Sequence, residues 1–204
     1  MYLTRLLLDT RSAQVRRDLG NLYELHRTLV RAFVQSDAQD VPRFLWRVEP
    51  QSAWNTPPVV LVQSEHRADW SPLQALPRYF KVPPESKVLS PEQLFPAGRR
   101  CRFRLFANPT VTRAGKRIGL VGEDAQLAWL QRQGQSHGFA LEAAIVTRSD
   151  ILKPRKGAAV LSLQRACYEG ILQVTDTELL KASLAAGVGP GKAFGCGLLS
   201  LGQI

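Results

Sequence analysis

The sequence contains only three cysteines and no long hydrophobic run. Cys101, Cys167 and Cys196 are odd in number and far apart, so neither a disulfide framework nor a C-x-x-C metal site is available. No run approaches 18 apolar residues, so no transmembrane helix is predicted. The first segment, MYLTRLLLDTRS, has too short an apolar stretch and an early charge, which is not typical of a signal peptide. We therefore expect a globular protein of the reducing cytoplasm, with no membrane partner.

Acidic residues are also scarce, since 17 Asp and Glu accompany 27 Lys and Arg for a formal net charge of +10. The excess lies in two acid-free segments, 97–117 with seven cations and 153–168 with four, so the rest of the chain is close to neutral. Guanidinium forks suit phosphates and base edges, and 20 of the 27 cations are arginines. The pattern favours nucleic acid over a membrane surface, for which no basic amphipathic helix is present. A merely solvated basic face is the alternative.

Periodicity and turn residues predict similar elements in both halves of the chain. In the first half we expect strands at 2–9, 43–50 and 57–66, a helix over 22–33, and, in the proline-rich stretch 71–96, a short helix, a weak strand near 86–89 and a linker. In the second half we expect strands at 101–109, 139–148, 158–167, 171–175 and 198–201 and helices at 123–136 and 176–186. Residues 110–117 are expected to form a basic turn, and Glu169-Gly170 a turn between two strands.

Each half therefore has the order β-α-β-β-α-β. This order predicts an α+β protein with two tandem ferredoxin-like (RRM-like) domains, over 1–90 and 97–204. A fold of this kind fixes no function by itself. The aromatic RNP1 motif of RNA-binding sheets is absent, so nucleic acid would be bound through loops and basic strands.

The first long helix carries the candidate catalytic groups. Tyr23, His26, Arg27 and Arg31 follow one flank of the helix, beside an apolar face centred on Leu22. A phosphodiester can be cleaved without metal when a base takes the ribose 2′-OH proton and an acid protonates the leaving 5′-oxygen, and histidine suits either role. Arginine can stabilise the charge on the phosphorane. The alternative is a boundary histidine packed beside the core.

The loop GVGPGKAFGCG (187–197) is the second candidate feature. It is not a Walker A loop, and no register gives G-x-G-x-x-G. Exposed amides at Gly189 and Gly191, with Lys192 beside them, could hold a phosphate backbone; a flexible connection before the last strand is the alternative. No His, Cys or carboxylate pair has metal-ligand spacing, so the sequence predicts neither a metal nor a cofactor.

Several segments resemble one known family, in the same order along the whole chain. They are MYLTRLLLD, NLYELHRTLVRAF, FLWRVE, RFRLFANPTVTRAGKR and GVGPGKAFGCGLLSL. Together they resemble CasE, the repeat-RNA endoribonuclease of the CRISPR Cascade complex. The resemblance implies a tandem ferredoxin-like fold and metal-independent cleavage of CRISPR precursor RNA beside a repeat hairpin. Attack by the 2′-OH would leave a 5′-hydroxyl and a 2′,3′-cyclic phosphate or 3′-phosphate, with the product retained in Cascade.

The resemblance also assigns site residues. His26 matches the family's catalytic histidine, Tyr23 its partner tyrosine and Arg31 a position where a relative has lysine. The glycine-rich loop matches the family's signature loop, and 153–156 lies where the family uses a basic hairpin to read the RNA stem. The expected RNA-binding residues are Arg27, Arg102, Arg104, Lys116, Arg117, Arg148, Lys153, Arg155, Lys156, Gly189, Gly191 and Lys192. A hairpin-binding subunit without catalysis, or an assembly subunit that mainly contacts proteins, are the alternative functions.

Overall fold

The first half of the chain forms a four-stranded antiparallel sheet with helices packed on it. The computed structural model describes residues 1–34, 40–51, 53 and 55–204. The strands are β1 (Tyr2–Leu7), β2 (Phe44–Val48), β3 (Val59–Ser64) and β4 (Glu85–Val88), in the order β2-β3-β1-β4. The helices are α1 (Ala13–Gly20), α2 (Leu22–Val30) and the short α3 (Ser71–Gln74). This is the strand order of a ferredoxin-like domain.

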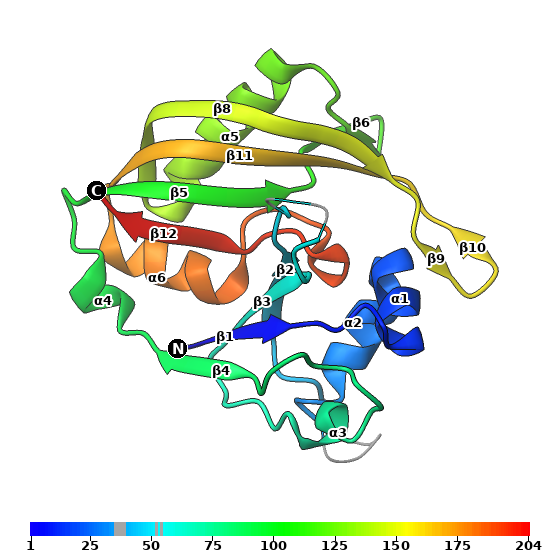
Figure 1. The fold of residues 1–204 in the computed structure, drawn as a ribbon. Coiled ribbons are helices and arrows are strands. Elements are labelled where there is room, and N and C mark those ends of the chain that lie inside the picture. Colours follow the sequence, from blue (N-terminus) through cyan, green and yellow to red (C-terminus); the bar gives the residue numbers. More distant parts are fainter. Residues whose placement is uncertain (35–39, 52, 54) are drawn as a thin grey trace.

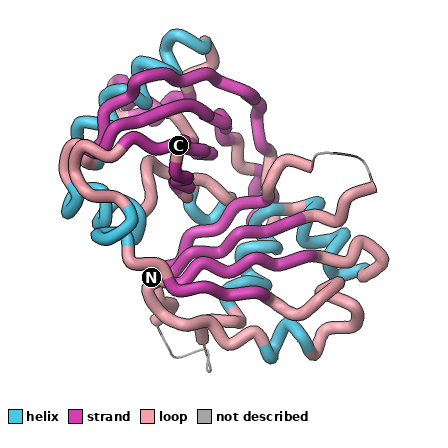
Figure 2. Tube along the Cα trace, turned by 60° about the vertical axis from the view of Figure 1, so that its left-hand side comes forward, coloured by secondary structure: helices cyan, strands magenta, loops and turns pink. Residues whose placement is uncertain are grey.

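The second half repeats this order. Its strands are β5 (Arg100–Ala107), β8 (Phe139–Leu152), β11 (Leu163–Val174) and β12 (Leu199–Gln203), in the antiparallel order β12-β5-β11-β8. Its helices are α5 (Glu123–His137) and α6 (Thr177–Ala186), and α4 (Pro91–Leu94) lies between the halves. Figures 1 and 2 show the two sheets as separate groups of strands. The prediction of two tandem ferredoxin-like domains is confirmed, and 1–90 and 97–204 stay the proposed boundaries.

The predicted turn at Glu169-Gly170 is wrong, because both residues lie inside the continuous strand β11. Gly170 pairs with Ala144 of β8 and with Phe103 of β5. A Cβ at this position would clash with the carbonyl oxygen of Ala143, so the glycine allows close approach of two backbones rather than a turn. The hairpin turn comes earlier, where β9 (Arg155–Lys156) pairs with β10 (Ala159–Val160) beyond the ends of β8 and β11.

Two further elements differ from the expectation. The basic segment after β5 is not a simple turn but a hairpin, β6 (Thr110–Arg113) and β7 (Lys116–Gly119). Helix α1 was not predicted, because one of its two buried positions is polar: Asp18 accepts a 2.6 Å hydrogen bond from the Tyr79 hydroxyl. A buried, hydrogen-bonded acid of this kind interrupts the apolar periodicity on which helix prediction depends.

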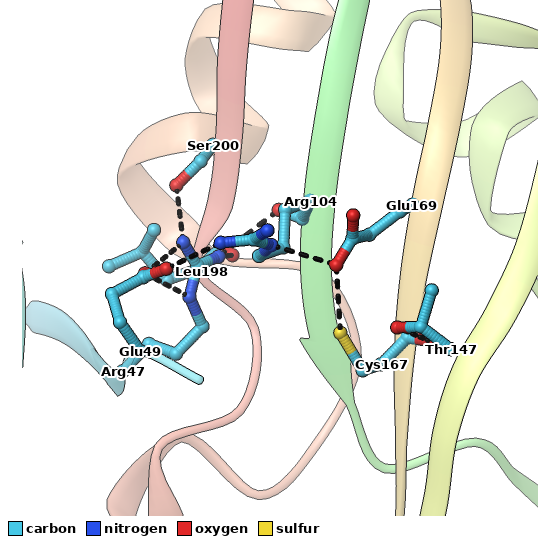
Figure 3. A network of polar contacts seen from close by, with 8 residues as sticks. All are labelled: Arg47, Glu49, Arg104, Thr147, Cys167, Glu169, Leu198 and Ser200. Atoms are coloured by element: carbon cyan, nitrogen blue, oxygen red, sulfur yellow. Dashed lines mark hydrogen bonds and ion pairs between the residues drawn. The ribbon is translucent and has the colours of Figure 1, made fainter. Parts of the chain in front are cut away.

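A buried arginine joins the two domains. Arg47 of β2 is only 2% exposed, and Figure 3 shows its guanidinium at the junction with β5 and β12. It donates to Glu49, to the carbonyl oxygens of Arg104 and Leu198 at 3.2 Å each, and to Ser200 Oγ at 3.0 Å. A charge this deeply buried is tolerated only when it is paired and hydrogen-bonded. Because the bonds to residues 104, 198 and 200 cross to the second domain, they require a fixed relation between the two sheets.

Candidate active site and nucleic-acid interface

Helix α2 places the predicted catalytic pair on one side of the first domain. The Asn21 side chain accepts a hydrogen bond from the Tyr23 amide and so caps the helix. Leu25 and Leu29 are fully buried in the domain core and fix the rotation of the helix. Tyr23 and His26, three residues apart, are therefore neighbours on the same helical surface.

His26 lies against the aromatic side chains of β2. Its ring stacks on Phe44, with centroids 5.3 Å apart, and the indole Nε1–H of Trp46 donates to His26 Nδ1 at 3.2 Å. Burial lowers the pKa of His26 below its ordinary value, because the imidazolium loses solvation. The side chain is only partly buried, and so it can still meet a ligand.

Two segments of the second domain contact Tyr23 on helix α2. Its ring centroid lies 6.1 Å from that of Phe194, in the short 3-10 helix η1 (Lys192–Phe194) of the glycine-rich loop. The Lys156 ammonium of the β9–β10 hairpin lies 5.7 Å from the same Tyr23 centroid, a cation–π distance. The glycine-rich loop and the basic hairpin, both from the second domain, therefore flank the predicted catalytic pair.

The two arginines predicted beside this pair have other partners. Arg27 is exposed and forms a 3.3 Å ion pair with Glu24, one turn back on α2. Arg31 follows the last residue of the helix, and its guanidinium donates to the Pro72 carbonyl of α3 at 3.4 Å. The structure thus brings Tyr23 and His26 together and directs these guanidiniums to neighbouring groups. A catalytic role for Arg31 stays a prediction.

Backbone groups of the basic hairpin hold it against the start of helix α2. Asn21 Nδ2 donates to the Arg155 carbonyl at 3.0 Å, and the Arg155 amide donates back to Asn21 Oδ1 at 3.3 Å. In Figure 1 the hairpin extends from β8 and β11 to lie beside α1 and α2. The predicted RNA-binding residues Lys153, Arg155 and Lys156 are all exposed, so their charges face solvent at the edge of the candidate site.

In the glycine-rich loop, Lys192 stabilises the loop itself. Its ammonium donates to the Gly189 carbonyl at 2.6 Å, and burial together with nearby Arg43 lowers the pKa of Lys192. Gly189 and Gly191 both have positive φ, 74° and 89°. The tight loop conformation brings η1 against α2, and a phosphate-binding role for these three predicted residues stays a prediction.

The remaining predicted RNA-binding cations divide into paired and unpaired groups. Arg104 forms ion pairs with Glu49 at 2.7 Å and Glu169 at 3.0 Å, and Arg148 pairs with Asp150 at 3.0 Å. The charge of Arg104 is thus already compensated within the domain junction of Figure 3, whereas Arg148 shares the single carboxylate of Asp150 with Arg165. Within 1–34, 40–51, 53 and 55–204, no ion pair is found for the exposed Arg102, Lys116, Arg117, Lys153, Arg155 and Lys156.

An open cleft of about 400 Å³ lies beside this cationic surface. It is bounded by the junction of α1 and α2 at Asn21, by the end of β2 at Glu49 and by the base of the hairpin at Lys153, with Arg148 and Arg165 along one wall. The cleft is therefore shared between the domains. Sequence reasoning predicted two of its lining residues, Arg148 and Lys153, as RNA-binding, but it did not identify the cleft itself or the partners of the predicted catalytic pair, Trp46, Phe194 and Asn21.

Neither a metal cluster nor a membrane-spanning helix is present in the part of the chain that the structure describes. No group of three or more His, Cys, Asp or Glu side chains there could hold a metal ion. No helix among those residues is long and apolar enough to cross a membrane.

Comparisons with known proteins agree along the whole chain. The model of a family described as "CRISPR associated protein" matches residues 1–203. The chain is 38% identical to the CRISPR-associated endoribonuclease Cse3 of Thermus thermophilus, over 98% of this chain and 99% of that protein. It is 29% identical to the CRISPR system Cascade subunit CasE of Escherichia coli, over the full length of both. The structure of T. thermophilus Cse3 bound to an RNA representing a pre-cleavage complex superposes with a TM-score of 0.87, at 39% identity and 98% coverage of each chain.

Proposed function

The chain belongs to the CRISPR-associated protein family that includes CasE and Cse3, and on this premise we propose that it is the endoribonuclease that processes CRISPR precursor RNA. It binds the repeat stem-loop, cleaves beside the hairpin and retains the product as a subunit of a Cascade complex. The full-length similarity to an endoribonuclease solved in a pre-cleavage RNA complex, and to a Cascade subunit, supports this proposal.

One observation in the structure of this chain itself supports the proposal. The Tyr23–His26 pair on α2 is flanked by Lys156 of the exposed basic hairpin and by Phe194 of the glycine-rich loop. The cations of the hairpin and of the β6–β7 segment would bind phosphates of the RNA stem, because a deep, narrow A-form major groove favours shape and phosphate contacts. An RNA held there places its backbone beside the phenol and the imidazole.

The proposed reaction needs two proton movements and no cofactor. The ribose 2′-oxygen attacks the phosphorus as its proton leaves, the bond between phosphorus and the 5′-oxygen breaks, and the 5′-oxygen receives a proton. The products are a 2′,3′-cyclic phosphate and a 5′-hydroxyl. Tyr23 and His26 act on these proton movements as acid, base or hydrogen-bond donor, while Arg27, and Arg31 once it leaves Pro72, would offset phosphorane charge.

The proposal is tested with two copies of the repeat hairpin from the same genome, one all-ribose and one with a 2′-deoxy residue at the cut position. Both are incubated with purified protein in EDTA, and His26→Gln purified in parallel controls for contaminating nucleases. We expect cleavage of the ribose copy alone and equal binding of both.

Three other results would contradict parts of this proposal. Tight binding with both copies intact would indicate a binding subunit without catalysis. Cleavage only after Mg²⁺ is restored would refute the metal-independent mechanism. Negligible affinity for either hairpin would indicate that the basic surface binds other proteins.

A further inference from the structure

The contact between Trp46 and His26 restricts which ring nitrogen of the histidine carries its proton. An indole N–H can only donate, so the nitrogen that accepts from it, Nδ1, must hold a lone pair. Neutral histidine has one proton, which is then on Nε2. Trp46 is 0% exposed, so rotating the His26 ring away would remove the one hydrogen-bond partner that the described residues provide for its buried indole N–H.

Trp46 is itself fixed from both sides. It is the central residue of β2, paired with Val62 of β3. On the loop side it lies beneath Gly195, where a Cβ would be 3.0 Å from Trp46 Cζ3 and where φ is +76°. Only a residue without a side chain fits there at low cost. The glycine-rich loop therefore packs on the indole that orients the catalytic imidazole.

We propose that Trp46 is a positioning residue that keeps His26 in the Nε2–H tautomer, so that His26 meets the RNA as a hydrogen-bond donor. The proposal rests on the cleavage function inferred above and assigns one role within it. Because Nε2 already holds a proton, that atom does not take the proton of the 2′-OH. His26 instead donates a hydrogen bond from Nε2 to an oxygen of the scissile phosphate or of the leaving group and keeps its proton, because a neutral imidazole that gave the proton away would become an imidazolate. It thereby stabilises the charge that develops on that oxygen, and the transferred protons pass through Tyr23 or solvent.

Protonation of His26 is opposed by the same contact, because an Nδ1–H would face the indole N–H. Burial acts in the same direction on the pKa. The charged groups on the elements packed around His26 are Glu24 and Arg27 of α2, Arg43 and Arg47 before and within β2, Lys192 of η1 and Lys156 of the hairpin. Burial, rather than any of these charges, is what lowers the pKa of His26.

The direct test is a two-bond ¹H–¹⁵N spectrum of the full-length protein labelled in histidine, without RNA. His26→Gln identifies the His26 signals among three histidines. In the wild type at high pH we expect Nδ1 to have the shift of an unprotonated nitrogen and Nε2 that of a protonated one. Trp46→Phe keeps an aromatic ring but removes the N–H, so we expect a mixture of tautomers and a rise in the pKa of His26.

Trp70→Phe is the matched control. Trp70 lies in the same domain at 9% exposure, and its indole nitrogen has no hydrogen-bond partner among the residues that the structure describes. Trp70→Phe makes the same replacement of an indole by a phenyl ring, at a position without a contact to His26. We therefore expect the tautomer and pKa of His26 and the cleavage rate to be those of the wild type. Thermal unfolding of both variants shows whether replacing the indole changes folding.

Cleavage kinetics test the role in the reaction. We expect Trp46→Phe to lower the single-turnover cleavage rate constant about 10-fold with hairpin affinity unchanged. A loss of about 10-fold is the lower end of the effect of removing the group that orients a histidine in metal sites. An Nδ1–H signal in the wild type, or Trp46→Phe spectra like the wild type's, would refute the positioning. A wild-type single-turnover rate constant in Trp46→Phe would refute its role in cleavage. Correct spectra in a protein that never cleaves RNA would refute the proposed function and leave the tautomer assignment standing.

Discussion

Replacing Arg47 tests whether the domain junction is a main source of stability. Arg47→Met keeps the aliphatic length but removes five donated hydrogen bonds, two to Glu49, two to carbonyl oxygens and one to Ser200. Breaking a buried ion pair costs about 3–5 kcal/mol. In Arg47→Met, Glu49 would still be paired with Arg104 at 2.7 Å. We therefore expect a loss of unfolding free energy at the lower end of this range, about 3 kcal/mol.

For a chain of this length each kcal/mol lowers the Tm by about 2–4 °C, so we expect a fall of roughly 6–12 °C for Arg47→Met. Calorimetric unfolding measures it. The matched control is Arg5→Met, because Arg5 and Glu85 form an ion pair with side chains 55% and 60% exposed, and such pairs contribute about 0–1 kcal/mol. If both variants unfold within about 3 °C of the wild type, the junction is not the stabilising feature we infer.

Three further variants test the site. His26→Ala is expected to lower single-turnover cleavage by about 10²–10⁴-fold with little change in hairpin affinity, measured by filter binding. Lys153, Arg155 and Lys156 together replaced by Ala should weaken binding and reduce the salt slope by about 0.9 for each phosphate that these cations neutralise; an unchanged slope refutes the hairpin assignment. Asn21→Ala removes a helix cap and both bonds to Arg155, so we expect a loss of about 0.5–2 kcal/mol in unfolding experiments, and faster amide exchange in the hairpin.

The fold was predictable because its signals are local. Strand and helix periodicities repeat in both halves, and each ferredoxin-like order followed from them. The errors have local causes as well. Helix α1 was not predicted because the polar Asp18 is buried in the core, where it accepts a hydrogen bond from Tyr79. The predicted turn at Gly170 was wrong because the glycine allows two strands to approach closely. In both cases the residue type is explained by a contact with a residue far away in the sequence, and local periodicity gives no information about such contacts.

The candidate site was only half predictable for the same reason. Tyr23 and His26 stand three residues apart on one helix, so spacing alone placed them together. The groups that hold the site are far from them along the chain: Trp46 lies 20 residues from His26, and Arg155 lies 134 residues from Asn21, to which it is hydrogen-bonded. Charge counting identified the basic segments, but it could not separate the paired Arg104 from cations that face solvent.

The site is built from both domains, and this has a consequence for catalysis. The first domain supplies α2, while the second supplies the basic hairpin and the glycine-rich loop that flank Tyr23. Arg47 helps to keep these parts aligned, because it holds β2 against β5 and β12. Because a catalytic geometry loses much of its rate when groups move by about 1 Å, a looser junction should slow cleavage without any change at His26. Activity in Arg47→Met well below its unfolding temperature therefore reports on the alignment of the domains, separately from their stability.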